Sequence, residues 1–269
     1  MENFLGVDRV AFNAFGYDIY WYGLIICAAI IVAVCVAVYY CKLKKYDTEM
    51  PINIALVILP AGILCARLFS VLFDSNLSMN EFFNFRTGGM SIIGAIVGGG
   101  LALLIYCLIK DRKNTLRYFD VLAVVLILAQ AIGRWGNYFN SEVYGRVVSP
   151  DSMYAVFPFV VEVNGTLYQA LFFYEFVLNM ISFIILSIMF LKAKKNGYVT
   201  AWYLILYGTI RTCLEPLRQT EYVLTFANLP ISRVLSIAMI AIGVILCVGL
   251  YVQSKKKKGV TDGQKAKNR

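Results

Sequence analysis

The chain has 269 residues, of which 60% are hydrophobic and 15% are charged, and its mean hydropathy is +0.70. Soluble domains carry about 25% charged residues, so this composition excludes a soluble protein built around one core. The net charge is +9. Residues 255–269 hold six Lys and one Arg against one Asp, or +6 of that charge. The basicity therefore indicates membrane orientation and not a nucleic-acid-binding surface.

The chain contains no histidine, and its seven cysteines form no Cys-X-X-Cys pair. A Ser-His-Asp triad, a Cys-His dyad and a histidine-held haem are excluded, and structural zinc is not expected. We expect no metal and no cofactor, and we interpret the cysteines as small buried hydrophobic residues. Residues 1–18 lack a basic stretch ahead of the first apolar run, which is unlike a cleaved signal peptide.

Seven apolar stretches are long enough to cross a bilayer, which takes about 20 residues. They cover residues 20–41, 52–73, 88–110, 119–139, 169–191, 198–216 and 231–252. The predicted fold class is an all-α integral membrane protein with seven transmembrane helices. Residues 1–254 form the predicted membrane domain, and residues 255–269 form a basic cytoplasmic tail.

Positive charge follows the first, third, fifth and seventh stretches, where 17 of the 25 Lys and Arg residues lie. Because cytoplasmic loops carry the excess of Lys and Arg, we expect the N-terminus outside and the C-terminus inside. The tail then anchors at the anionic inner leaflet. Residues 140–168 are the longest outer loop, and Val156–Gly165 predicts a small β-hairpin that ends in an Asn-Gly turn.

Ionisable side chains inside the predicted spans are costly and mark a functional interior by default. These residues are Arg67, Arg134, Glu175, Arg211 and Glu215. All fall in the outer half of their spans, which indicates one polar cavity open to the outer leaflet. The alternative for each is a helix-to-helix ion pair or an arginine that reaches the outer headgroups.

Arg134 and Arg211 at similar depth suit a bidentate hold on phosphate. Neutral polar side chains are expected in the same layer: Tyr22, Asn137, Asn140 and Tyr207. Gly94 and Gly98 have the spacing of close helix packing. Gly88, Gly89 and Ser91 precede that packing motif and leave helix N-terminal amides exposed, where an anion is favoured.

The string Gly133-Arg134-Trp135-Gly136-Asn137-Tyr138-Phe139-Asn140-Ser141-Glu142-Val143-Tyr144-Gly145-Arg146 ends the fourth span. An aromatic belt at the membrane interface accounts for its aromatic residues. It does not account for the arginines, asparagines and glutamate. Binding of a lipid headgroup accounts for both groups.

This string resembles the signature of the bacterial prolipoprotein diacylglyceryl transferases, roughly G-R-x-G-N-F/Y-x-N-x-E-x-x-G. Gly133, Arg134, Gly136, Asn137, Tyr138, Asn140, Glu142 and Gly145 meet its fixed positions. Further family-like pieces follow in order over essentially the whole chain: Tyr20–Leu24, Gly88–Ser91, Phe172–Glu175, and Tyr207–Arg211 with Glu215.

The resemblance implies a multi-pass protein of the bacterial cytoplasmic (inner) membrane. It implies transfer of the diacylglyceryl group of phosphatidylglycerol to the lipobox cysteine thiol of a preprolipoprotein, with release of glycerol phosphate. By resemblance, Arg134 and Arg211 hold the phosphate, Asn137, Asn140 and Tyr22 orient the headgroup, and Glu142, Tyr207 and Glu215 organise the cations or the thiol. Substrate contact is also implied for Gly88, Gly89, Ser91 and Gly145.

The chain departs from the family at Ile93, which aligns with a position where many relatives carry histidine and some tyrosine. It also lacks a second histidine, which many relatives carry near the position aligned with Gln169, and it has Arg233 where glutamine is usual. Thiol deprotonation then falls to a carboxylate, to a tyrosinate, or to an arginine field that lowers the thiol pKa. A non-catalytic phospholipid-binding paralogue is the alternative function. A transporter is disfavoured because neither internal symmetry nor a midplane polar site is visible.

Overall fold

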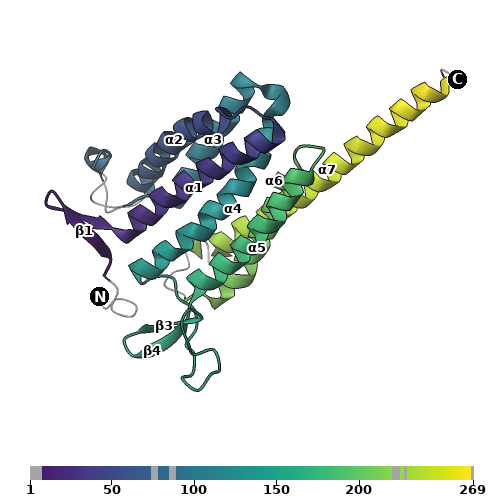
Figure 1. Ribbon diagram of the computed structural model, residues 1–269. Helices are drawn as coiled ribbons and strands as arrows, with labels where there is room; N and C mark the ends of the chain where they lie inside the picture. The colour runs from purple at the N-terminus through teal and green to yellow at the C-terminus, as the bar shows by residue number, and fades with distance from the viewer. Residues whose placement is uncertain (1–7, 74–77, 85–88, 220–224, 227–228, 268–269) are drawn as a thin grey trace. The chain divides into compact units, whose positions relative to one another are not determined.

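The computed structural model describes residues 8–73, 78–84, 89–219, 225–226 and 229–267 (Figure 1). Its helices are α1 (Trp21–Lys44), α2 (Met50–Phe73), α3 (Ile92–Lys110), α4 (Thr115–Asn140), α5 (Leu171–Lys192), α6 (Tyr198–Leu214) and α7 (Ile231–Lys267). Three single 3-10 turns accompany them: η2 (Met79–Glu81), η4 (Arg112–Asn114) and η5 (Glu215–Leu217). The strands form three hairpins: β1 (Val10–Ala14) with β2 (Tyr17–Tyr20), β3 (Val160–Val163) with β4 (Thr166–Gln169), and β5 (Thr225–Phe226) with β6 (Leu229–Pro230).

The fold is mostly helical, and the length and apolar composition of its helices confirm the prediction of an all-α membrane protein. Six of the described helical segments are long and apolar enough to cross a membrane: 21–44, 50–73, 92–110, 112–140, 171–192 and 231–255. Helix α6 has 17 residues and begins where the sixth stretch was predicted. The β3–β4 hairpin confirms the predicted one, and it turns at Asn164 and Gly165, both at positive φ. Its strands begin later than expected and continue to Gln169.

The chain divides into two compact units, one of residues 34–118 and the other of residues 1–33 and 119–269. In the first, α2 and α3 pack so closely that a Cβ on Gly94 or Gly98 would collide with Cys65. The close packing predicted for these two glycines is therefore confirmed.

Arg67 of α2 lies in this first unit, with its side chain completely buried. Its guanidinium donates to the carbonyls of Phe82 (3.2 Å), Asn84 (2.8 Å) and Gly89 (3.0 Å). Backbone carbonyls are the partners that let a cation remain inside apolar surroundings. Arg67 therefore ties the connection between α2 and α3 to the end of α2.

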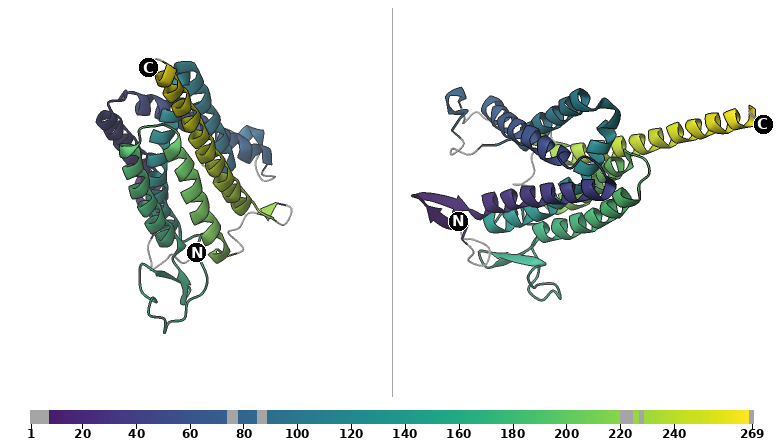
Figure 2. Two further views of the ribbon diagram at one scale, coloured as in Figure 1. Left: turned by 90° about the vertical axis from the view of Figure 1, so that its right-hand side faces the viewer. Right: turned by 45° about the horizontal axis from the view of Figure 1, so that its top comes forward.

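The second unit carries the close pair α6 and α7. A Cβ on Gly208 would lie 2.7 Å from the carbonyl oxygen of Ser236, and a Cβ on Gly243 would lie 2.7 Å from that of Ala201. Both glycines thus let the two helix backbones touch. Helix α7 continues well past the start of α6 as one long helix (Figure 2).

Helix α4 meets the first half of α1 in the same unit. A Cβ on Gly136 would lie 2.7 Å from Cδ2 of Tyr22, so the tyrosine ring rests on the bare backbone of α4. Beside it, the rings of Trp21 and Phe139 stack with centroids 5.1 Å apart. Gly136 of the signature string therefore makes room for the ring of Tyr22.

The start of α6 is capped from α4. Gly197, at φ 97°, offers no side chain to its own helix. Buried Asp120 accepts hydrogen bonds from the backbone N–H of Gly197 (2.6 Å), the N–H of Thr200 (2.8 Å) and the Thr200 hydroxyl (2.6 Å). A carboxylate at a helix N-terminus satisfies free amides and opposes the helix dipole.

Replacing Asp120 by asparagine is expected to lower the free energy of unfolding by about 1–3 kcal/mol, because a neutral amide cannot accept all three bonds. Thermal and denaturant unfolding in detergent micelles measure the change. Exposed Asp151 supplies the matched control, and Asp151→Asn is expected to shift the unfolding free energy by less than about 0.5 kcal/mol. Equal shifts in the two variants would contradict a capping role for Asp120.

Candidate functional site

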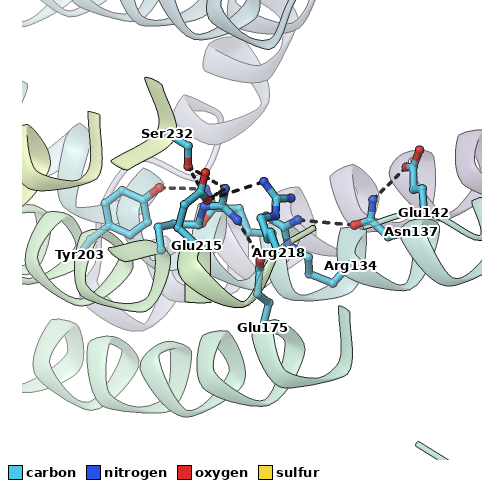
Figure 3. A network of polar contacts seen from close by, with 10 residues as sticks. Arg134, Asn137, Glu142, Glu175, Tyr203, Glu215, Arg218 and Ser232 are labelled. Carbon is cyan, nitrogen blue, oxygen red and sulfur yellow. Dashed lines mark hydrogen bonds and ion pairs between the residues drawn. The ribbon is translucent and has the colours of Figure 1, made fainter. Parts of the chain in front are cut away.

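One buried carboxylate joins two arginines from different helices. Glu175 of α5 contacts Nε of Arg134 on α4 at 2.6 Å and Nη1 of Arg211 on α6 at 2.8 Å (Figure 3). The charges that the sequence placed in three separate spans thus meet as helix-to-helix ion pairs. Such ion pairs are the alternative that the sequence left open for these residues. They still leave part of each arginine side chain exposed, as described below.

Residues from η5 and α7 extend the ion pairs. Arg211 Nη2 lies 3.2 Å from Glu215 Oε2 and donates to the Ser232 hydroxyl at 2.9 Å, and that hydroxyl donates to Glu215 Oε2 at 2.9 Å. Arg218 Nη1 lies 3.7 Å from the same carboxylate oxygen. We call Arg134, Arg211, Arg218, Glu175 and Glu215 the arginine cluster.

The arginine cluster turns its cations outward. The side chains of Arg134, Arg211 and Arg218 are 18%, 10% and 12% exposed, whereas those of Glu175 and Glu215 are 1% and 2% exposed. Three guanidinium groups face two carboxylates, which leaves one positive charge in excess. A cation excess whose arginine side chains are more exposed than their carboxylate partners is the electrostatic complement of a phosphate group.

The surroundings of Arg218 disfavour its positive charge. Burial and the positive charge of Arg211 lower the pKa of its guanidinium, and Glu175 opposes that effect in part. Its Nε is buried without a hydrogen-bond partner among the described residues. An anion bound beside Arg218 would therefore remove an unfavourable charge repulsion as well as supply a missing partner.

A chain of neutral amides leads away from Arg134. Arg134 Nη1 donates to Asn137 Oδ1 at 3.5 Å, Asn137 Nδ2 donates to Glu142 Oε1 at 2.9 Å, and Asn140 Nδ2 donates to the same oxygen at 3.4 Å. Glu142 has these amides, and no arginine ion pair, among the contacts of the described residues. The three predicted polar residues at the end of the fourth span, Asn137, Asn140 and Glu142, are thus brought together in one network.

Gly145 shapes the segment that follows Glu142. A Cβ at this position would lie 2.9 Å from both Cβ and Oε1 of Gln169 on β4, and Gly145 N–H donates to the Gln169 carbonyl at 2.9 Å. Its carbonyl accepts from Gln219 at 3.2 Å. Gly145 therefore fixes the backbone beside the site, and a direct substrate contact stays a prediction.

Both predicted tyrosines lie beside Arg134. The Tyr207 side chain lies close to Arg134, and its ring stacks on that of Tyr203 with centroids 5.8 Å apart. Tyr22, seated on Gly136, lies within electrostatic range of Arg134 and Glu142. The second unit thus places Tyr22 and Tyr207 next to the cation that the sequence assigned to phosphate.

The glycine-serine segment before α3 belongs to the first unit. Gly88 lies outside the described residues. Gly89 is at φ 72° and gives its carbonyl to Arg67, and the Ser91 hydroxyl accepts from Gly94 N–H at 3.3 Å as the cap of α3. The Ser91 N–H also donates to the Ala66 carbonyl at 3.0 Å. Two of the amides predicted to be free thus already have partners, and substrate contact by this segment stays a prediction.

The aromatic residues of the signature string pack inside the protein. Trp135 contacts Phe172 and Phe176 edge to face at 5.4 and 5.7 Å, and Tyr138 contacts Phe172 at 5.2 Å. They cover a small core that includes buried Val161 of β3. Packing of the β3–β4 hairpin against α4 and α5 therefore accounts for these rings.

Sequence reasoning missed Arg218 and Ser232, and it noticed Glu175 without giving it a role. Arg218 follows Glu215 by three residues, the spacing of neighbours on one helical face, so this signal was readable. Ser232 carried no comparable signal, because its contact with Arg211 depends on the packing of α7 against α6.

Known proteins of one family resemble this chain over almost its whole length. A family model described as prolipoprotein diacylglyceryl transferase matches residues 9–249. Relatives named phosphatidylglycerol–prolipoprotein diacylglyceryl transferase include one from Clostridioides difficile strain 630, 35% identical over 95% of this chain and 100% of the relative. One from Finegoldia magna is 35% identical over 89% of this chain and 94% of the relative, and one from Clostridium botulinum strain Loch Maree is 36% identical over 94% and 99%. This chain belongs to the prolipoprotein diacylglyceryl transferase family.

Proposed function

We propose that this chain transfers the diacylglyceryl group of phosphatidylglycerol to the lipobox cysteine thiol of a preprolipoprotein. The observation that carries the proposal is the arginine cluster, whose excess positive charge and partly exposed arginine side chains suit a phosphate that leaves as an anion. The family membership supports the same reaction. No cofactor is needed, because the step is a displacement at carbon.

In the proposed step, the cysteine sulfur attacks the glyceryl carbon next to the phosphate. A C–S bond forms, the C–O bond breaks, and the electron pair leaves with the phosphate oxygen as glycerol phosphate. Arg134 and Arg211 stabilise the charge that develops there. Glu142, held by Asn137 and Asn140, accepts the thiol proton. Asn137, Asn140 and Tyr22 orient the headgroup, while Glu215 and Tyr207 hold the arginines.

The proposed setting is the bacterial cytoplasmic membrane, with seven spans that include α6 and an outer N-terminus. The Lys and Arg distribution supports this orientation. It also supports an inner-leaflet position for the tail from Lys255 onward. The site then lies in the outer half of the membrane, where preprolipoproteins present their lipobox cysteine.

The test is reconstitution of the purified chain with phosphatidylglycerol vesicles and a synthetic lipobox peptide. Diacylglyceryl peptide and glycerol phosphate are expected in equal amounts. Product is expected to vanish with Arg134→Ala and with a peptide that carries serine in place of cysteine. Lipid binding without product in the unaltered protein would overturn the proposal in favour of a non-catalytic phospholipid-binding protein.

A further inference from the structure

Neutral polar side chains lie beyond the arginine cluster on each of the three helices that carry it. Gln130 precedes Arg134 by four residues on α4, Asn179 follows Glu175 by four on α5, and Tyr203 precedes Arg211 by eight on α6. Four residues are about 6 Å along a helix, and eight are about 12 Å. The cluster lies near the ends of α4 and α6 and near the start of α5, so all three steps lead into the helices. We call Gln130, Asn179 and Tyr203 the neutral layer.

The neutral layer holds unused hydrogen-bonding groups. Gln130 Nε2 donates to the Tyr203 hydroxyl at 3.0 Å, which leaves the hydroxyl proton of Tyr203 to donate elsewhere. Asn179 is 0% exposed, and neither of its amide atoms has a hydrogen-bond partner among the described residues. An unpaired buried amide is costly among apolar helices. The Asn179 amide thus offers a donor and an acceptor that the described residues leave unused, and these could pair with a ligand or a buried water.

The order of the layers matches the order of groups in a diacyl glycerophospholipid. Figure 3 shows Tyr203 at one end of the row of polar side chains, the arginine cluster in the middle and Glu142 at the other end. In the lipid, the phosphate lies between the polar headgroup and the glycerol backbone with its two ester carbonyls. These carbonyls are joined to the phosphate through the glycerol backbone, only a few bonds away, and they accept hydrogen bonds.

We infer that the neutral layer is a subsite for the ester carbonyls of the bound phospholipid, with Asn179 Nδ2 and the Tyr203 hydroxyl as the donors. The inference rests on the proposed function, because it takes the phosphate to lie at the arginine cluster. Two fixed ends, phosphate and esters, hold the glyceryl carbon between them in line for attack by sulfur. The subsite also selects diacyl lipids over dialkyl lipids, which lack the carbonyls.

The test compares phosphatidylglycerol with its diether analogue, 1,2-di-O-alkyl phosphatidylglycerol of equal chain length, in the unaltered protein and in Asn179→Leu. The unaltered protein is expected to lose about tenfold in kcat/KM with the diether lipid, the worth of one to two buried hydrogen bonds. The Asn179→Leu protein is expected to lose about tenfold with the diester lipid and to discriminate less than about threefold between the two lipids. Equilibrium binding of both lipids to both proteins is expected to show the same loss of discrimination.

Stability supplies a second measurement. Replacing an unpaired buried amide by leucine is expected to leave the Tm of the lipid-free protein unchanged or higher. The matched control is Ser187→Ala, because Ser187 is also buried on α5 with a hydroxyl unpartnered among the described residues, but lies two turns further along. This control is expected to retain discrimination. Asn179→Ser provides a smaller change should leucine prevent folding, with the same expected loss of discrimination.

Equal use and equal binding of the two lipids by the unaltered protein would overturn the inference. So would an Asn179→Leu loss of the same factor with both lipids, which is the signature of a structural role. Failure of the proposed function looks different, because the unaltered protein would then make no product from either lipid. In that case the binding comparison still decides whether ester carbonyls are recognised.

Discussion

Replacing Arg134 by lysine is expected to lower kcat/KM for diacylglyceryl transfer by about 10²–10³-fold. The guanidinium of Arg134 holds Glu175 through Nε and Asn137 through Nη1 at the same time. An ammonium group keeps the charge but cannot make both contacts and also meet a phosphate. Initial rates in phosphatidylglycerol vesicles with a lipobox peptide measure the loss.

Arg146 supplies the matched control for this change. It lies in the same signature string, is exposed, and donates from Nη2 to the backbone carbonyl of Pro216 at 3.1 Å. Arg146→Lys is expected to change kcat/KM by less than about threefold. Full activity in Arg134→Lys would show that a single positive charge is enough. It would contradict the view that the guanidinium must contact Glu175, Asn137 and the phosphate together.

Replacing Glu175 by glutamine is expected to lower the free energy of unfolding by about 3–5 kcal/mol and to abolish activity. Its carboxylate is the shared partner of Arg134 and Arg211, and its loss leaves Arg134 without a carboxylate partner among the described residues and Arg211 with Glu215 alone. Thermal unfolding in micelles measures the stability. The exposed Glu162 on β3 is the control, and Glu162→Gln is expected to unfold within about 0.5 kcal/mol of the unaltered protein.

A double variant separates the two consequences of losing Glu175. Glu175→Leu combined with Arg211→Met removes a cation together with its carboxylate, so part of the stability lost in Glu175→Gln is expected to return. Activity is expected to stay absent, because the phosphate then lacks Arg211. Recovery of activity in the double variant would contradict the assignment of Arg211 to the substrate.

The sequence predicted the features that depend on composition and local pattern. Apolar length located the helices, the Asn164-Gly165 pair located the β3–β4 turn, and the spacing of Gly94 and Gly98 indicated the packing of α3 on α2. These signals are local, so a single chain contains them in full. The signature string likewise indicated Arg134 and Glu142 before any geometry was known.

The missed features depend on contacts between distant residues or on unusual turns. The β1–β2 hairpin turns through Phe15 and Gly16, both at positive φ, and phenylalanine is not a residue that signals such a turn. Glu175 can contact both Arg134 and Arg211 only because α5 packs beside α4 and α6 with the three residues at a similar depth. Asp120 caps α6 through Gly197, which lies 77 residues later in the chain, and no local pattern reports such a cap.

The two glycine contacts between α6 and α7 bear on how the site works. Gly208 and Ala201, which meet α7, are about 10 Å apart along α6, so the two helices can neither slide nor pivot freely against each other. Arg211 on α6 and Ser232 on α7 therefore keep their spacing when charge shifts onto the leaving phosphate. Little reorganisation of the surrounding dipoles is then required during the reaction, because the arrangement that favours the transition state is built when the helices pack.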